Sequence, residues 1–297
     1  MKNKVDIHAD DYGLTMNTSK EILTAVNAKK LDSISVVPNM LNYDAALVLW
    51  NAERKEGVEP DISVHLNFME GHCCASKQEV GSLVDDIGYF RISWIDLVKY
   101  NYNIFKYTKI KAELKTEIRK QLWKVIDDYQ LLNGKKLRVD SHQHTHMIPI
   151  VMKALLEVIE EDKIPTEYIR ISRERVLPYL KLVKYYPTYR FVNLVKVAIL
   201  NFFAVEDEKM LKQKQISFAI FCGVFLSGRM DIERVGSVLP DLKKKAEQNK
   251  KALEVIFHPG TALQKEVGEE FVSKDAVAFY LSENRKTEYH TVMNLQK

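Results

Sequence analysis

The stretch "KLRVDSHQHTHMIPIVMKALLEVIEED", residues 136–162, contains a short strand pattern, a polar junction and an amphipathic helix pattern. The helix pattern begins near Pro149, and proline is favoured in the first turn of a helix. In the junction, Asp140, His142, His144 and His146 occupy alternate positions. Extended backbone places alternate side chains on one face, so a strand here predicts a single cluster of carboxylate and imidazole groups.

The same order of strand and helix continues in both directions along the chain. Strand patterns are expected at residues 4–10, 33–39, 61–68, 136–144, 166–172, 216–223 and 253–260, with helix patterns between them. This alternation is typical of parallel βαβ units, so the sequence predicts an α/β fold. We expect a distorted or incomplete (β/α) TIM-like barrel of about seven parallel strands, with a doubly wound sheet as the alternative. No phosphate-binding glycine motif follows the first strand, so nucleotide-binding versions of these folds have no support.

The chain contains no linker rich in proline, glycine or serine, so we expect one domain over residues 1–297. Residues 174–214 are mostly helical in pattern, with breaks at Pro178 and Pro187, and predict a helical insertion. The most apolar part, residues 195–205, is shorter than the roughly 20 residues that a membrane-spanning helix needs. We interpret it as a buried or interface helix, which is compatible with a homodimer.

Charge and cysteine content restrict the kinds of partner. The chain has 44 basic and 40 acidic residues, a net charge of +4, and its basic clusters are scattered, so neither nucleic acid nor a membrane is an expected partner. Cys73, Cys74 and Cys222 have neither metal-site nor disulfide-framework spacing. The first residues lack the apolar stretch of a secretory signal. These features favour free thiols and a cytoplasmic location.

Polar side chains gather where the expected strands end. They are Asp10 and Asp11 after the first strand, His65, Asn67 and Glu70 after the third, Asp140, His142, His144 and His146 after the fourth, Arg170 and Ser172 on the fifth, and His258 after the seventh. Each has a simpler explanation by itself, such as a turn cap, a core histidine or a surface histidine tract. Because the carboxyl ends of parallel strands meet at one edge, these groups together predict a functional site. One aspartate and two histidines would suit zinc, manganese, iron or magnesium and leave a position open for water.

Several short motifs, spread along most of the chain, resemble the motifs of one known protein family. They are "HADDYGLT" (8–15), "VHLNFMEG" (64–71), "GSLVDDIGYF" (81–90), "EIRKQ" (117–121), "VDSHQHTHMIP" (139–149), "YIRIS" (168–172) and "FHPG" (257–260). Together they resemble the motifs of the YdjC-like carbohydrate deacetylases, the family of chitooligosaccharide deacetylase. The motif at residues 139–149 is the most specific of them. The segment "HCCASKQEV" (72–80) departs from the family pattern, and the helical region 174–214 is long for the family. Both are expected to touch loops that face the substrate.

The resemblance implies a distorted (β/α) barrel and an enzyme that releases acetate from N-acetylated amino sugars or short oligosaccharides such as chitooligosaccharides. By motif, Asp11, His65 and His142 would bind one divalent metal ion, Mg²⁺ or Zn²⁺, with Mn, Fe or Co as further options. Asp10 would be the general base and His258 the general acid. The residues that would bind substrate or orient these groups are Asn67, Glu70, Asp140, His144 and Arg170.

Two other classes of function remain open at this point. Another metal-dependent hydrolase, such as a phosphoesterase or a cyclic amidohydrolase, would bind two or three metal ions, and His144 and His146 would suit that. A carbohydrate-binding protein without catalytic activity would release no acetate from any N-acetylated sugar. The number of bound metal ions and a screen for acetate release separate these classes from a deacetylase.

Overall fold

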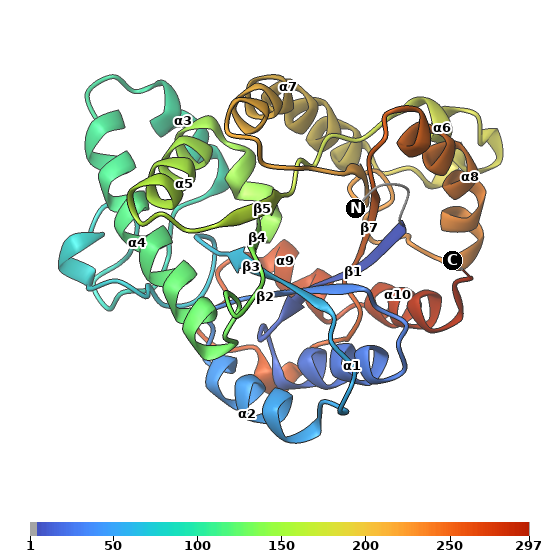
Figure 1. Ribbon diagram of the computed structural model, residues 1–297, viewed down its shortest axis with the longest axis horizontal. Coiled ribbons are helices and arrows are strands. Elements are labelled where there is room, and N and C mark those ends of the chain that lie inside the picture. The colour runs from blue at the N-terminus through green and yellow to red at the C-terminus, as the bar shows by residue number, and fades with distance from the viewer. Residues whose placement is uncertain (1–4, 297) are drawn as a thin grey trace.

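The computed structural model describes residues 5–296, and its centre is one sheet of seven parallel strands in the order β5-β4-β3-β2-β1-β7-β6 (Figure 1). The strands are β1 (Val5–Tyr12), β2 (Ser33–Val36), β3 (Asp61–Leu66), β4 (Leu137–Ser141), β5 (Thr166–Ile169), β6 (Ile220–Cys222) and β7 (Leu253–Phe257). The predicted α/β fold with about seven parallel strands is therefore confirmed.

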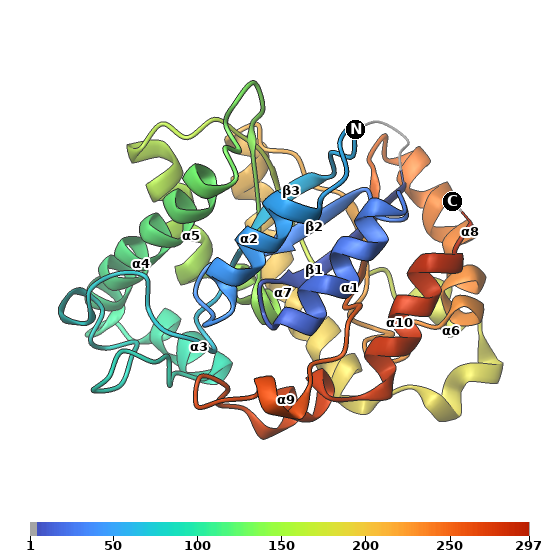
Figure 2. The same cartoon turned by 90° about the horizontal axis from the view of Figure 1, so that it is seen from below.

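Helices surround the sheet on its outer side. They are α1 (Met16–Asn27), α2 (Tyr43–Glu53), α3 (Trp94–Tyr102), α4 (Tyr107–Asp128), α5 (Pro149–Glu161), α6 (Leu177–Leu180), α7 (Phe191–Gln213), α8 (Ile232–Gln248), α9 (Lys274–Tyr280) and α10 (Glu283–Asn294). Four short 3₁₀ segments are η1 (Lys77–Glu79), η2 (His142–Met147), η3 (Val183–Thr188) and η4 (Gln264–Glu266). Helices α1 and α2 cover one side, α4 and α5 the next, and α6 and α8 the opposite side (Figures 1 and 2). Within residues 5–296, no helix combines the length and the apolar character needed to cross a bilayer.

The sheet curls until its two edge strands approach each other, which makes it an incomplete barrel. Isolated parallel bridges join Tyr168 to Ser217 and Glu174 to Phe221, across the gap between β5 and β6. At the first bridge, the Ile169 amide donates to the Ser217 carbonyl at 3.1 Å. Isolated bridges, rather than a continuous ladder of backbone hydrogen bonds, therefore connect the two edges of the sheet. We call this gap the β5–β6 seam.

The inside of the barrel is polar, and its outside is apolar. Along β1, Asp6, His8 and Asp10 alternate with Ile7 and Ala9, and all five are buried. The alternation places the polar set inside the curl and the apolar set against the helices. Buried charges are tolerated only when they are paired and hydrogen-bonded.

The interior groups meet that condition. A guanidinium nitrogen of Arg138 donates to Asp6 at 2.9 Å, and the Ser33 hydroxyl donates to the other Asp6 oxygen at 2.5 Å. The two ring nitrogens of His8 lie 2.6 Å from the hydroxyls of Ser33 and Ser35. Polar residues at every second strand position therefore form a connected network inside the barrel.

The structure corrects the expected extent of several elements. The fourth strand ends at Ser141 instead of residue 144, and η2 follows with positive φ angles of 51° at Gln143 and 57° at His144. The alternate histidines therefore do not share one strand face. The sixth strand covers only Ile220–Cys222. After β7 the chain forms the two helices α9 and α10.

Candidate metal and catalytic site

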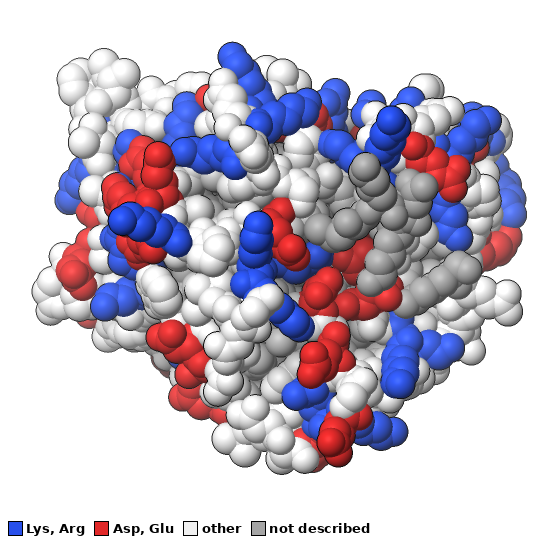
Figure 3. Space-filling model, in the orientation of Figure 1, with Lys and Arg blue, Asp and Glu red and all other residues white. Residues whose placement is uncertain are grey.

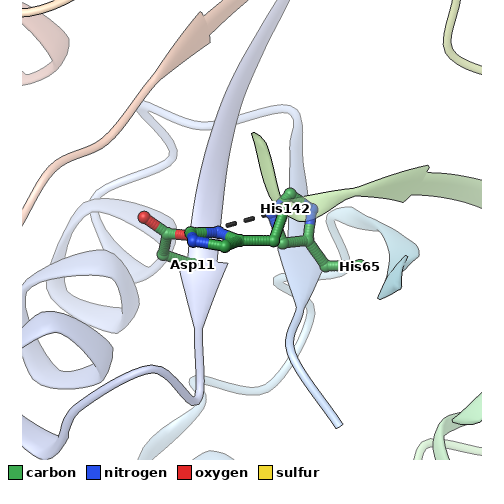
Figure 4. A group of neighbouring side chains, drawn as sticks. All are labelled: Asp11, His65 and His142. Atoms are coloured by element: carbon green, nitrogen blue, oxygen red, sulfur yellow. Dashed lines mark hydrogen bonds and ion pairs between the residues drawn. The ribbon is translucent and has the colours of Figure 1, made fainter. Parts of the chain in front are cut away.

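Three side chains from distant parts of the sequence meet at the carboxyl ends of β1, β3 and β4. Asp11, His65 and His142 each offer a ligand atom within 4.8 Å of the others, and all three are buried (Figure 4). Nδ1 of His142 lies 3.1 Å from Oδ1 of Asp11, and Nε2 of His65 lies 3.7 Å from the same oxygen. We call these three residues the Asp–His–His cluster.

A distortion at the end of β1 turns Asp11 toward the cluster. In a regular strand, Asp10 and Asp11 would point to opposite faces. The pairing of β1 with β2 shifts register between Ala9 and Tyr12, and Asp11 has a φ of +75°. Aspartate tolerates this left-handed conformation better than most residues. Two consecutive carboxylates can therefore both reach the inner end of the barrel.

The ring of His65 is oriented by a carboxylate behind it. Nδ1 of His65 lies 2.6 Å from Oδ1 of Asp140, whose other oxygen accepts a 2.5 Å hydrogen bond from Ser35. Burial opposes ionisation of Asp140, but the nearby Arg170 guanidinium outweighs it and lowers the pKa below its usual range. An ionised Asp140 can only accept, so Nδ1 of His65 donates and Nε2 carries the free lone pair.

The cluster fits a divalent metal ion by its donor chemistry. One carboxylate and two neutral imidazoles are the ligands of many catalytic metal sites. Oδ2 of Asp11 is buried and accepts no hydrogen bond within the described residues, although the Arg285 guanidinium lies 3.0 Å away as an ion pair. Burial opposes ionisation of Asp11, but Arg285 and His142 hold its pKa far below the usual range. Asp11 is thus an ionised carboxylate whose Oδ2 faces Arg285 and whose Oδ1 faces the two imidazoles.

Arg170 lies between three carboxylates inside the barrel. Its two terminal nitrogens donate to the two oxygens of Asp10, each at 2.9 Å. One of these nitrogens also lies 2.9 Å from Asp140, and Nε donates to Glu254 at 3.1 Å. Burial opposes ionisation of Asp10, but Arg170 holds its pKa well below the usual range. The guanidinium therefore fixes the orientation of Asp10 and keeps it ionised.

His258 is placed beside Asp10 by a tight turn after β7. Its Nε2 lies 4.0 Å from Oδ2 of Asp10, and its Nδ1 lies 3.4 Å from Oε2 of Glu288. Burial lowers the pKa of His258, but Glu288 outweighs it, so the pKa is raised. Gly260 has a φ of +95°, and a Cβ there would lie 2.7 Å from Cα of Thr18. Only glycine fits this turn, because the turn rests directly on the first turn of α1.

The remaining predicted residues have different surroundings. Asn67 accepts hydrogen bonds from the backbone amides of Met69 and Glu70, so it shapes the loop rather than facing the cluster. Glu70 lies 3.8 Å from Nε2 of His142, and burial raises its pKa to about 6. His144 lies 2.9 Å from the Ser172 hydroxyl, and burial lowers its pKa.

His146 has a role in the architecture of the barrel. Its ring nitrogens lie 2.5 Å from the Ser141 hydroxyl and 2.8 Å from the Arg170 carbonyl oxygen. It is fully buried, and burial lowers its pKa to about 4. The neutral ring thus joins the end of β4 to the residue that follows β5.

Three residues of the site come from the C-terminal helices and were not predicted from the sequence. The Tyr280 hydroxyl lies 2.7 Å from Nε2 of His142 and donates to Glu70 at 2.9 Å. Arg285 and Glu288 contact Asp11 and His258, as described above. All three lie at the end of α9 or on α10. A polar residue in a surface helix is common, so the sequence does not indicate that these residues belong to a site.

A cleft lined by both polar and apolar side chains opens beside the turn that holds His258. It has a volume of about 520 Å³ and lies between the start of α1, residues 41–42 and residues 263–270. Asn17, which lines it, donates to the carbonyl oxygen of Thr261, three residues after His258. With a side chain 17% exposed, His258 is more accessible than Asp10 or Asp11.

The chain is similar to several known proteins. It is 25% identical over 172 residues to a carbohydrate deacetylase of Xenopus laevis, covering 58% of this chain and 51% of that protein. It is 27% identical over 168 residues to a carbohydrate deacetylase of Brevibacillus brevis, covering 56% of this chain and 59% of that protein. The matched part thus spans little more than half the length of these relatives.

A solved structure and a family model extend the similarity to the whole described chain. A protein of Enterococcus faecalis V583, named for cellobiose-phosphate cleavage, superposes with a TM-score of 0.62 at 17% identity and covers 100% of this chain and 97% of its own. This likeness concerns the fold alone. The model of the family described as YdjC-like protein matches residues 4–296. The chain therefore belongs to the YdjC-like protein family.

Proposed function

We propose that this protein is a metal-dependent hydrolase that removes the N-acetyl group from N-acetylated amino sugars or short oligosaccharides such as chitooligosaccharides. The observation that carries the proposal is the Asp–His–His cluster beside Asp10 and His258, at the carboxyl ends of the strands. The names of the similar proteins, carbohydrate deacetylases, support the same chemistry and substrate class.

Asp11, His65 and His142 would hold one divalent ion, Mg²⁺ or Zn²⁺, with Mn, Fe or Co as alternatives. Such an ion lowers the pKa of a bound water and polarises a carbonyl oxygen. Asp140 would keep the donor nitrogen of His65 directed at the ion through its 2.6 Å contact with Nδ1.

Asp10 and His258 would move the protons of the hydrolysis. Asp10, fixed by Arg170, accepts a proton from water as the water oxygen forms a bond to the acetyl carbon. His258, whose protonated form is favoured by Glu288, donates a proton to the sugar nitrogen as the C–N bond breaks. Acetate and the free amine are the products, and the water has supplied one oxygen and two protons.

The position of Arg170 favours one metal ion over two or three. His8, Asp10 and Asp140 also offer ligand atoms close together, as a second metal site would require. A guanidinium nitrogen of Arg170 nevertheless lies 2.9 Å from both Asp10 and Asp140, so a cation already neutralises these carboxylates. Arg285, in contrast, contacts only Oδ2 of Asp11 and leaves Oδ1 facing the two imidazoles. A second divalent ion beside Arg170 is therefore less favoured than one at the Asp–His–His cluster, which argues against a multinuclear phosphoesterase or amidohydrolase.

A screen for acetate release tests the proposal. We expect acetate from N-acetylglucosamine, its β-1,4 oligomers or related amino sugars, loss of release with a chelator, and recovery with one metal ion per chain. Release of phosphate from phosphoesters with two bound ions would contradict the proposal. Binding of the sugars without acetate release, in protein that holds its metal ion, would also contradict it and would indicate a carbohydrate-binding protein.

A further inference from the structure

Large apolar side chains project from the turn between α3 and α4. Ile104 and Phe105 are 80% and 91% exposed, and Ile95 and Tyr102 beside them are also exposed. With Val98, Lys99 and Asn103, these residues line a shallow hollow of about 580 Å³. Exposed apolar side chains that cluster in this way mark an interaction surface rather than isolated surface residues.

A second exposed apolar segment runs from α6 through η3 into α7. Phe191 and Phe202 are 78% and 70% exposed, and Leu177, Val183 and Val205 are similarly exposed. Helix α7 therefore presents apolar side chains to solvent as well as to the barrel. The sequence had suggested that residues 195–205 form a buried or interface helix, and the structure leaves much of this helix uncovered.

The two segments lie along one side of the molecule. The rings of Trp94 on α3 and Phe203 on α7 are 6.1 Å apart, so these helices are neighbours. Helices α3, α7 and α6 follow one another along the upper edge of Figure 1. We call the exposed parts of residues 95–109 and 177–205 the apolar–basic face.

Basic residues accompany the apolar ones, and Asp96 is the one acidic residue within residues 95–109 and 177–205. Residues 97–112 contain Lys99, Lys106, Lys109 and Lys111 and no aspartate or glutamate, and residues 176–205 contain Lys181, Lys184, Arg190 and Lys196 and no acid. White and blue side chains predominate along the upper edge of Figure 3, over these elements.

Only part of this positive charge is neutralised by neighbouring elements. Five of the eight basic residues have a carboxylate at ion-pair distance: Lys99, Lys109, Lys111, Lys181 and Lys184. Within residues 5–296, Lys106, Arg190 and Lys196 have none, and all three are exposed. The ammonium group of Lys106 lies 5.8 Å from the centre of the Tyr100 ring. Lysines above tyrosine rings beside exposed phenylalanines match the boundary between lipid headgroups and acyl chains.

We propose that the apolar–basic face docks on the surface of a lipid bilayer that contains anionic lipids. Phe105, Ile104, Phe191 and Phe202 would enter the acyl boundary, and the lysines would contact the headgroup phosphates. This mode of binding needs no membrane-spanning helix. It revises the sequence expectation that no membrane is involved, and it is independent of the proposed deacetylase activity.

The docked face would lie close to the end of the barrel that holds the site. Helices α4 and α7 each lead into a strand of the parallel sheet, so their first residues, Tyr107 and Phe191, lie at the carboxyl ends of the preceding strands. The Asp–His–His cluster lies at the same ends. A docked protein would therefore hold this end of the barrel near the bilayer.

Co-sedimentation of the full chain with vesicles tests the docking. We expect binding to phosphatidylcholine vesicles that contain 30% phosphatidylglycerol, weak binding to pure phosphatidylcholine, and weaker binding at high salt because lipid charge is screened. The double variants Ile104→Ser/Phe105→Ser and Phe191→Ser/Phe202→Ser should each bind at least about tenfold more weakly, because each loses two apolar anchors. Replacing Lys106, Arg190 and Lys196 with glutamine should remove most of the salt dependence.

Val48→Ser is the matched control, since Val48 is 68% exposed on α2, on the opposite side of the molecule in Figure 1. It should bind vesicles like the wild type. Failure of the wild type to bind anionic vesicles, or equal binding by the face variants, overturns the proposal. Light scattering measures the oligomeric state of the wild type and of the same variants. A wild-type dimer that these variants convert to monomer would show that a second copy of the chain covers the face, and this result would also overturn the proposal.

Discussion

His65 and Asp140 form a 2.6 Å contact between Nδ1 and Oδ1 that joins two neighbouring strands below the Asp–His–His cluster. The contact spans paired residues of β3 and β4, because His65 lies opposite Asp140 in the register. Strand pairing therefore sets the orientation of a ring whose other nitrogen points at Asp11.

Asp140→Asn should weaken metal binding about 10–100-fold, because a neutral amide orients the ring of His65 less firmly than a carboxylate does. Titration calorimetry with Zn²⁺ and Mn²⁺ measures the change. Asp44→Asn, on the exposed surface of α2, is the control and should keep the wild-type affinity. Unchanged affinity in the Asp140 variant would show that this contact does not support the ligand.

Asp10→Asn should keep the metal ion and lose turnover. Asp10 is absent from the Asp–His–His cluster, and the proposed mechanism gives its carboxylate the role of general base. A general base contributes about 10²–10⁴ to the rate, so kcat should fall by at least about 100-fold. Metal content per chain and the initial rate of acetate release are measured on the same sample. A variant with wild-type kcat would remove Asp10 from the mechanism.

Glu288→Gln should move the alkaline limb of the pH profile to lower pH. Glu288 raises the pKa of His258, and the general acid acts only while it is protonated. Without the carboxylate, His258 loses its proton at a lower pH, so kcat/KM declines earlier as the pH rises. The dependence of kcat/KM on pH is the measurement, with Glu283→Gln on the exposed start of α10 as control. An unmoved alkaline limb would show that another group is the acid.

Asp207→Asn should stabilise the fold at neutral pH. Both carboxylate oxygens of Asp207 are buried in α7 without a hydrogen-bond partner among residues 5–296, and burial raises the pKa to about 9. The folded protein thus keeps this proton while the unfolded chain loses it above about pH 4, so stability falls as the pH rises from there toward 9. The penalty grows by about 1.4 kcal/mol per pH unit, which amounts to a few kcal/mol at pH 7.

Thermal unfolding of the Asp207 variant at several pH values checks this. The difference in Tm from the wild type should be large at pH 8 and close to zero near pH 4. Glu206→Gln, with its side chain half exposed beside it, should show no such trend. A pH-independent difference would mean that Asp207 is ionised in the folded protein.

The fold and the gathering of polar residues at the strand ends could be predicted from local patterns, whereas the choice of Asp11, His65 and His142 as one group came from the resemblance to the YdjC-like motifs. Strand and helix alternate visibly along the chain, and polar residues at strand ends stand out against apolar neighbours. The geometry of those residues could not be predicted from the sequence. Asp11 reaches the cluster through a register shift and a positive φ, and His144 leaves the strand in the same way. Neither distortion has a sequence signature, since no glycine marks the two positions.

The residues contributed by α9 and α10 could not be predicted for a different reason. Tyr280, Arg285 and Glu288 reach the site only because the C-terminal helices pack against the barrel end. Packing of this kind depends on contacts across more than 200 positions of the chain, such as the hydrogen bond between Tyr280 and Glu70. Asn67 is a different case, because the hydrogen bonds that its side chain accepts from Met69 and Glu70 span only two and three positions of its own loop.

The β5–β6 seam affects how the protein behaves in concentrated solution. An open barrel exposes two strand edges, and unpaired edges can join those of another molecule and start aggregation. Here the edges are short, since β5 has four residues and β6 has three, and the Tyr168–Ser217 and Glu174–Phe221 bridges occupy part of them. Short and partly occupied edges leave little backbone for a foreign strand. The barrel can therefore remain incomplete without becoming a template for intermolecular sheet growth.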